Sequence, residues 1–503
     1  MHRVSRVQFA MHSLRRDASR LYENINLNLP VFMESQISKA FSPEDFRANG
    51  HKLIDMLADQ LSKSQSTNPD HTILRETPDD QLKFWQDDLN SSLLDDPGEL
   101  FKDMLSRSIN LYSRRCMGHQ VPPPAPAAVL GSLLSGFLNN GSAVYEMGMT
   151  GNALEKIVTE SLAQKFGLGA DASGFVTSGG TLGNLTVLLA ARAAVTDVWD
   201  HGLAGHNNLA IMVSEESHYS VDRAARIMGL GSEGIIKVPV NNKYQLRTDL
   251  LDEYLEKAER SGKKVFCIIG CACSTSTGAY DDLRAIGAFA KKHNIWLHVD
   301  GAHGAAAIYS LQYKTLLDGI ELADSVIIDF HKMMLTPSLS TAVIYKRGSD
   351  SYKTFAQKAQ YLWADQEKEE WHNSGKRTFE CTKPMSILSI YTLMRMYGDE
   401  LFEENIETLF SLAREFAALI KSNKNFELAC EPQSNIVCFK YVSKKLAEDV
   451  NKKILQHLIA DGRYYIVSTT INENSYLRTA IMNPLTRISE LAGLLDLIDG
   501  LDL

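Results

Sequence analysis

The chain has 503 residues, of which 44% are hydrophobic and 22% are charged, and its formal net charge is −9. This composition is typical of a packed globular protein and excludes a chain that is mainly disordered. The acidic balance differs from the basic excess of a general nucleic-acid-binding protein, and no uncharged apolar run is long enough for a transmembrane helix. We therefore expect neither a nucleic acid nor a membrane as a partner.

The chain has seven cysteines, which is too low a density and an odd number for a disulfide scaffold. The cysteines therefore indicate reduced thiols. Cys271 and Cys273 stand two positions apart, but no second pair or spaced histidine accompanies them, so we expect no metal site. Buried reduced thiols are typical of a cytoplasmic protein.

Residues 1–32 contain five arginines and only Asp17 and Glu23 as acids. This composition is compatible with a transit peptide. We prefer to interpret the segment as a dispensable leader or an early start, with the folded protein beginning near Met33.

Residues 33–115 are predicted to form an N-terminal helical segment. Its first helix begins with Ser42 as the cap, Pro43 in the first turn, and Glu44 and Asp45 at the positive end. The stretch from His71 to Pro97 is polar and is expected to be irregular. The proline-rich stretch from Gly118 to Ala128 is expected to be an ordered loop.

From about Thr150, short apolar strands alternate with amphipathic helices, which predicts a mostly parallel sheet covered on both faces. The expected strands are Gly174–Thr177, Leu209–Ser214, Ile235–Val238, Val265–Ile269, Trp296–Val299, Ser325–Ile328 and Thr341–Tyr345, and the expected helices are Leu182–Trp199, Ser220–Met228, Arg247–Ser261 and Leu283–His293. We expect a large α/β domain over residues 116–375. A small C-terminal α/β domain should follow over 376–503, with strands Ile436–Tyr441, Tyr464–Thr470 and Tyr476–Ile481.

Three features of the large domain carry chemistry. The glycine-rich turn Thr177–Asn184 follows a strand and opens a helix, so its backbone N–H groups can bind a phosphate, although a turn that serves only packing has a similar pattern. Asp300 ends an apolar strand, at the edge where parallel sheets bind ligands. Lys332 follows the next strand between apolar neighbours, where it can form a Schiff base with an aldehyde cofactor.

The order of these features predicts a pyridoxal 5'-phosphate site. In such a site the turn holds the phosphate, the aspartate keeps the pyridine nitrogen protonated, and the lysine holds the aldehyde carbon.

The sequence from about Pro43 to Leu503 resembles the group II pyridoxal-dependent decarboxylases, which include glutamate, cysteine sulfinate, aspartate, aromatic amino acid and diaminobutyrate decarboxylases. The resemblance is carried by Ser178–Thr181, Ser217–Ser220, Tyr280–Leu283, His298–Asp300, His331–Lys332 and Asn483–Pro484. It implies the fold type I of pyridoxal-phosphate-dependent transferases, similar to aspartate aminotransferase. It also implies a homodimer, and the apolar stripe of the helix from Pro43 would need a partner to cover it.

The resemblance also implies residue roles. Catalytic roles are implied for Lys332, His218, Asp300 and His331, and cofactor binding for Gly180, Thr181, His218, Thr275, Asp300, His331 and Lys332. His218 matches a histidine that stacks on the pyridine ring. Arg478 matches an arginine that relatives with acidic substrates use for the α-carboxylate. Gln120 falls near a pocket residue of glutamate decarboxylases, and Tyr145–Glu146 matches a Tyr–Glu pair in the same decarboxylases.

The chain departs from the family at two places. Where relatives usually carry a large aromatic residue after the aspartate, this chain has His303, preceded by Gly301 and Ala302. The loop Tyr361–Gly375 lacks the late tyrosine that protonates the reaction intermediate in many relatives, so the proton could come from His331, His372 or Tyr361. Asp329 also stands where relatives often have asparagine.

The leading hypothesis is therefore a carboxy-lyase that converts a small L-amino acid into an amine and CO2, with glutamate, aspartate or cysteine sulfinate favoured. The alternatives keep the cofactor and change the outcome: a 2,4-diaminobutyrate decarboxylase, an amine-oxidising aldehyde synthase or an aminotransferase. A non-catalytic regulatory paralogue is a further alternative, but such a protein would be expected to have lost Lys332 or the phosphate-binding turn.

Overall fold

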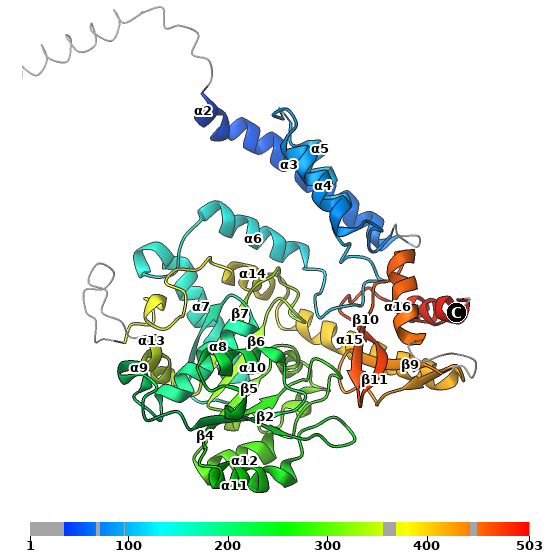
Figure 1. Ribbon diagram of the computed structural model, residues 1–503. Coiled ribbons are helices and arrows are strands. Elements are labelled where there is room, and N and C mark those ends of the chain that lie inside the picture. Colours follow the sequence, from blue (N-terminus) through cyan, green and yellow to red (C-terminus); the bar gives the residue numbers. More distant parts are fainter. Residues whose placement is uncertain (1–34, 67–70, 95, 356–368, 443–449, 502–503) are drawn as a thin grey trace, which may run out of the picture. The chain divides into compact units, whose positions relative to one another are not determined.

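The computed structural model describes residues 35–66, 71–94, 96–355, 369–442 and 450–501. The described residues fall into two compact units (Figure 1). Unit 1 contains the described part of Met1–Leu61 together with Phe84–Arg107, and unit 2 contains Ser62–Lys83 and Ser108–Leu503. The proposed leader, residues 1–32, lies outside the described residues.

The N-terminal segment is helical, with α2 (Gln36–Ala40), α3 (Pro43–Gln65), α4 (Pro78–Leu89) and α5 (Gly98–Ser106). Helix α3 begins where the sequence predicts, and Ser42 Oγ accepts a hydrogen bond from the backbone N–H of Asp45 at 3.1 Å. The expectation of irregular structure from His71 to Pro97 is wrong, because α4 lies within this stretch. Thr77 and Asp80 cap α4 reciprocally: the N–H of Asp80 donates to Thr77 Oγ1 and the N–H of Thr77 donates to the Asp80 carboxylate.

Unit 2 is organised around a seven-stranded sheet with the order β1-β7-β6-β5-β4-β2-β3. The strands are β1 (Ser173–Thr177), β2 (Leu209–Ser214), β3 (Ile235–Val238), β4 (Lys264–Cys271), β5 (Trp296–Asp300), β6 (Ser325–Asp329) and β7 (Thr341–Tyr345). Only β7 runs against its neighbours; the other pairings of this sheet are parallel. The prediction of a mostly parallel α/β fold is confirmed.

Helices cover both faces of this sheet (Figure 1). The helices of this part of unit 2 are α6 (Pro126–Leu138), α7 (Tyr145–Lys165), α8 (Gly180–Ala193), α9 (Val198–His201), α10 (Tyr219–Ile227), α11 (Leu251–Arg260), α12 (Leu283–His293), α13 (Tyr352–Phe355) and α14 (Ile387–Tyr397). Alternate strand residues point to opposite faces, so Ile211 and Ile269 pack in the core cluster with α8 and α10, while Met212 and Ile268 pack in the cluster with α7 and α12.

Several expected boundaries differ from the structure: the predicted helix Arg247–Ser261 is α11 at Leu251–Arg260, and the predicted strand Tyr464–Thr470 is β10 at Val467–Ile471. The predicted helix Leu182–Trp199 is two helices, α8 and α9, and the predicted proline-rich loop ends earlier, because α6 begins at Pro126. Proline suits the first position of a helix, since the N–H that it lacks has no partner there.

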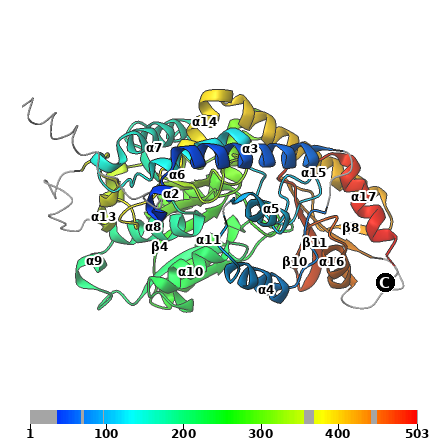
Figure 2. The same ribbon diagram turned by 90° about the horizontal axis from the view of Figure 1, so that it is seen from above.

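The second sheet has four antiparallel strands in the order β10-β11-β9-β8. These are β8 (Phe426–Leu428), β9 (Ile436–Tyr441), β10 (Val467–Ile471) and β11 (Asn474–Ala480), accompanied by α15 (Glu400–Ser422), α16 (Val450–Asp461) and α17 (Ile488–Asp499). Helix α16 lies beside β10 and β11 (Figure 2). Among the described residues, no helix combines the length and the hydropathy that crossing a membrane requires.

Candidate active site

The candidate site lies at the carboxyl ends of strands in the large sheet. Strands β5 and β6 are parallel, and β1 and β6 both run against β7, so β1, β5 and β6 end at the same edge. The turns that follow them surround a cavity of about 250 Å³. This arrangement is where open α/β sheets bind their ligands.

The cavity brings together most of the residues that the sequence singles out. Its lining includes all the expected catalytic and cofactor-binding residues: Gly180, Thr181, His218, Thr275, Asp300, His331 and Lys332. They come from five different strand ends or loops and are separated by up to 152 positions between Gly180 and Lys332. The fold therefore gathers these residues into one place.

The glycine-rich turn between β1 and α8 has the geometry of an anion site. Gly179 has a φ of 99°, a conformation that favours glycine, and α8 begins at Gly180. A side chain at Gly180 would come within 3.2 Å of the Asp329 carboxylate oxygens. The first N–H groups of a helix have no partner within the helix, so those of Gly180 and Thr181 are available for an anion.

Asp300 is buried and held by hydrogen bonds to both carboxylate oxygens. Asn184 Nδ2 donates to Oδ2 at 2.9 Å, and the backbone N–H of Ala302 donates to Oδ1 at 3.2 Å. Asn184 is itself oriented, because its Oδ1 lies 2.9 Å from His298 Nε2. Burial lowers the pKa of His298 to about 4, so this ring is neutral. Because Asn184 Nδ2 donates to Asp300, the oxygen Oδ1 faces His298 and Nε2 is the donor.

His218 caps helix α10 and lies at the cavity. Its Nδ1 is 2.7 Å from Ser220 Oγ and accepts from the Ser220 N–H at 3.3 Å. Burial lowers the pKa of His218, and the nearby carboxylate of Asp300 partly opposes this effect. A neutral ring suits stacking on an aromatic ligand.

Lys332 places its amine in the cavity, where it pairs with a buried carboxylate. Lys332 Nζ lies 3.0 Å from Asp329 Oδ2, and His331 Nε2 lies 3.6 Å from the same oxygen. Thr341 Oγ1 donates to Asp329 Oδ1 at 2.5 Å. Asp329, whose role the sequence leaves open, therefore positions the amine of Lys332.

His303 lines the cavity and has one ring nitrogen without a partner among the described residues. Its Nε2 lies 2.7 Å from Asn435 Oδ1, and Asn435 Nδ2 donates to the carbonyl of Ile481 at 2.8 Å, which fixes the amide so that His303 Nε2 is the donor. Nδ1 is buried and has no partner among the described residues. Burial lowers the pKa of His303 to about 3, with Lys332 adding to the effect, so His303 is neutral.

The expected substrate residues do not line this cavity. Arg478 lines an adjoining cavity of about 380 Å³, which shares His218 and Thr275 with the first. Gln120 lines neither cavity, although its neighbour His119 lines the second. Of the residues that could supply a proton, His331 lines the first cavity, His372 packs its ring against Tyr145 at 5.7 Å, and Tyr361 lies outside the described residues.

Sequence reasoning gave no role to Asn184 or Ser220, although both stand in the quoted motifs, and it did not single out Glu380. A polar residue one helical turn after the glycines, on the same side as the cavity, is a signal for Asn184. Glu380 carries no such signal, because its partners lie about 200 positions earlier in the chain.

These residues fit pyridoxal 5'-phosphate. The turn has the glycines and free amides that a phosphate needs, Lys332 offers an amine for an aldehyde, and Asp300 offers a carboxylate for a ring nitrogen.

Comparison with known proteins agrees with this fit. The model of the "Pyridoxal-dependent decarboxylase conserved domain" matches residues 119–442. The chain is 28% identical over 416 residues to L-2,4-diaminobutyrate decarboxylase of Acinetobacter baumannii, covering 79% of this chain and 81% of the relative. It is 27% identical over 467 residues to aromatic-L-amino-acid decarboxylase of Bacillus atrophaeus, covering 90% and 94%.

A solved structure, the glutamate decarboxylase domain of diaminobutyrate-pyruvate transaminase and L-2,4-diaminobutyrate decarboxylase from Vibrio parahaemolyticus, superposes with a TM-score of 0.79. Its sequence identity is 25%, and the match covers 90% of this chain and 94% of that one. The chain therefore belongs to the pyridoxal-dependent decarboxylase family and is a carboxy-lyase that uses pyridoxal 5'-phosphate to remove CO2 from an amino acid.

Proposed function

We propose that the substrate is a small L-amino acid with an acidic side chain, such as glutamate, aspartate or cysteine sulfinate, and that the product is the corresponding amine. Arg478 carries this proposal. Its side chain is buried, and Nη1 donates to the carbonyl of Gly118 at 3.3 Å. Its Nε and Nη2 are buried without a hydrogen-bond partner among the described residues.

A buried guanidinium without a counter-ion is costly, and burial lowers the pKa of Arg478. A ligand carboxylate in the adjoining cavity would supply the missing partner, because the guanidinium fork matches a carboxylate with two parallel hydrogen bonds. Gln120 is proposed as a second substrate contact, since it lies two positions from Gly118, the backbone partner of Arg478.

The roles proposed for the cavity residues follow from their positions. Bound pyridoxal 5'-phosphate supplies an aldehyde that bonds to amines and a protonated ring that accepts the electrons released with CO2. Gly180 and Thr181 would hold the phosphate, Lys332 the aldehyde carbon, and Asp300 the ring nitrogen. His218 would stack on the ring, and Thr275 and His331 would contact the cofactor from the remaining sides.

A second candidate substrate is a diamino acid such as 2,4-diaminobutyrate. The cavity that Arg478 lines is also lined by Glu215 and Glu216. A substrate with a carboxylate and a distal ammonium group would find a partner of opposite charge for each.

The decisive experiment incubates the purified holoenzyme with acidic, diamino and aromatic L-amino acids and measures CO2 and the identity of the product. We expect CO2 and an amine from an acidic amino acid, and Arg478→Met should raise KM for that substrate. Release of CO2 only from diamino acids, with a rise in KM in Glu216→Gln, would favour the second candidate. An aldehyde with ammonia would indicate amine oxidation, and a keto acid would indicate transamination.

We also propose that the enzyme is a cytoplasmic homodimer. Helix α6 supports the dimer, because Leu130, Leu133 and Leu134 are each more than half exposed. The apolar residues Ile54 and Leu57 of α3 are exposed as well. Surfaces of this kind are expected to be covered by another chain. Light scattering of the purified protein that gives the mass of one chain would contradict the dimer.

A further inference from the structure

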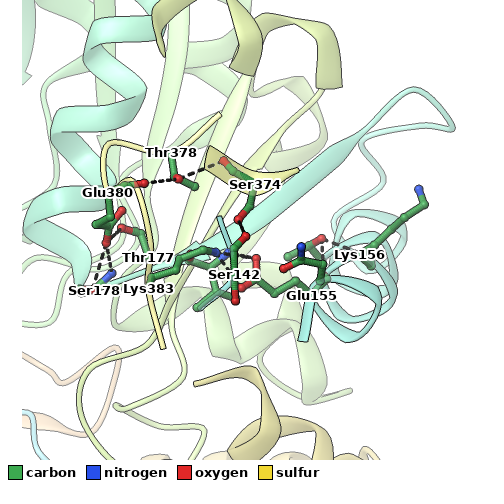
Figure 3. Close-up of polar contacts among 12 residues, drawn as sticks. Ser142, Glu155, Lys156, Thr177, Ser178, Ser374, Thr378, Glu380 and Lys383 are labelled. Atoms are coloured by element: carbon green, nitrogen blue, oxygen red, sulfur yellow. Dashed lines mark hydrogen bonds and ion pairs between the residues drawn. The ribbon is translucent and has the colours of Figure 1, made fainter. Parts of the chain in front are cut away.

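Glu380 binds the strand end that leads into the glycine-rich turn. Its Oε1 accepts hydrogen bonds from Thr177 Oγ1 at 2.8 Å, from the Ser178 N–H at 3.2 Å and from Ser178 Oγ at 3.0 Å (Figure 3). Thr177 is the last residue of β1, and Ser178 lines the active-site cavity beside Gly179. The carboxylate of Glu380 therefore fixes the entry to the turn that we assign to the cofactor phosphate.

The carboxylate of Glu380 has no cation as a partner among the described residues, whereas the neighbouring carboxylates of Asp329 and Glu155 each pair with a lysine. Oε2 of Glu380 is buried and has no hydrogen-bond partner among the described residues, and no ion pair to a described cation is present. Asp329, the other carboxylate at the turn, pairs with Lys332 at 3.0 Å. Lys383, three positions after Glu380, pairs with Glu155 at 2.6 Å and cannot serve Glu380 as well (Figure 3).

A phosphate at Gly180 and Thr181 would meet two opposing effects. The free amides and the positive end of α8 attract it. The negative charge of Glu380, one hydrogen bond away from the turn, repels it, and the repulsion is strong where both groups are partly shielded from water.

We propose that Glu380 is a positioning residue of the phosphate-binding turn whose charge also weakens cofactor binding, so that the enzyme exchanges pyridoxal 5'-phosphate with the surrounding solution. The inference rests on the proposed assignment of Gly180 and Thr181 to the phosphate. The hydrogen bonds keep the turn in shape, and the charge sets the affinity. These two contributions can be separated, because glutamine keeps the acceptor oxygen and loses the charge.

The test compares the Kd of pyridoxal 5'-phosphate with that of pyridoxal, which lacks the phosphate, for the apoenzyme. In Glu380→Gln the Kd of pyridoxal 5'-phosphate should fall on the order of tenfold, while the Kd of pyridoxal should not change. Glu404→Gln is the matched control: Glu404 is exposed on α15 in the same unit, and its replacement removes the same net charge without touching the turn. It should change neither Kd.

Two results would overturn the inference. The first is a Kd for pyridoxal 5'-phosphate in Glu380→Gln that equals the wild-type value, and the second is an equal gain in affinity for pyridoxal 5'-phosphate and for pyridoxal. If Glu380→Gln does not fold, as judged by its Tm, Glu380→Ala replaces it. In Glu380→Ala the Kd of pyridoxal 5'-phosphate divided by the Kd of pyridoxal should still be lower than in the wild type, and an unchanged ratio would overturn the inference. Gly180→Val tests the underlying assignment separately, because its side chain would collide with Asp329 and obstruct the turn. If Gly180→Val binds pyridoxal 5'-phosphate normally, the proposed phosphate site itself is wrong.

Discussion

The replacement Asp300→Asn separates the chemistry of the site from cofactor binding. Asp300 accepts hydrogen bonds on both oxygens, from Asn184 and from the N–H of Ala302. Asparagine can accept on only one side, so a donor would face a donor on the other. An unsatisfied buried donor costs about 1–3 kcal/mol in stability, which sets the expected loss of folding free energy and bounds the loss of cofactor affinity.

In Asp300→Asn, the loss of kcat should be larger than the loss of cofactor affinity. A group placed to stabilise developing charge contributes about 100- to 1000-fold to kcat, or about 2.7–4 kcal/mol. The assay is kcat at saturating substrate and cofactor, compared with the Kd of pyridoxal 5'-phosphate. We expect kcat to fall by about that factor, while cofactor still binds.

Asp281→Asn is a matched control. Asp281 is also buried and also accepts two backbone N–H bonds, from Leu246 at 2.7 Å and from Cys271 at 2.8 Å, but it does not line the cavity. It should lose stability without losing kcat at saturating cofactor. A near-normal kcat in Asp300→Asn, or an equal loss of kcat in both variants, would refute the reasoning.

Three further predictions concern stability and the N-terminus. Lys383→Met should destabilise the protein by about 3–5 kcal/mol, because it leaves the buried carboxylate of Glu155 without its cation. The double variant Lys383→Met with Glu155→Gln should recover most of this stability. Denaturant unfolding that shows no recovery would contradict this account. Burial lowers the pKa values of His298 and His303 to about 4 and about 3, below the value of about 6.5 in the unfolded chain. The unfolded chain therefore binds more protons in acid than the folded protein does. Stability should fall as the pH is lowered from about 6.5, by about 3 kcal/mol per histidine at pH 4. Melting of the apoenzyme should show a smaller acid-induced drop in Tm for His303→Gln than for the wild type, and an equal drop would count against the assignment. A chain that starts at residue 33 should keep cofactor, dimer and turnover, which absorbance, light scattering and a CO2 assay would measure, and loss of any of these would show that the leader is needed.

Much of the large sheet could be predicted because its strands are short apolar runs between helices. Strands β2, β3 and β7 have the predicted limits; β2 and β7 are continuous apolar runs that are buried on both faces, whereas β3 lies at the edge of the sheet and exposes Lys237. The positions of Asp300 and Lys332 follow from the same pattern, because a polar residue directly after a buried strand lies at the ligand-binding edge. Helix α4 was missed because the polar composition of its region was given more weight than the capping residues Thr77 and Asp80.

The contacts that connect distant parts of the chain could not be predicted. Lys383 and Glu155 are 228 positions apart, and neither residue alone reveals a buried pair. The family resemblance implies that His303 stands where relatives usually carry an aromatic residue, but the contact with Asn435 is needed to identify the ring nitrogen that has no partner among the described residues. For Arg478 the sequence could not show an absence of contacts: its proposed role in substrate binding depends on two guanidinium nitrogens that have no partner among the described residues.

The central claim, that Lys332 holds the cofactor in this cavity, can be tested by reducing the holoenzyme with borohydride and mapping the labelled peptide by mass spectrometry. Reduction makes the bond between the lysine amine and the cofactor aldehyde permanent. The account predicts a pyridoxyl label on Lys332 and none on the buried Lys376 or Lys383, and no label in Lys332→Ala. A label on another lysine in the wild-type enzyme, or full activity of Lys332→Ala, would contradict it.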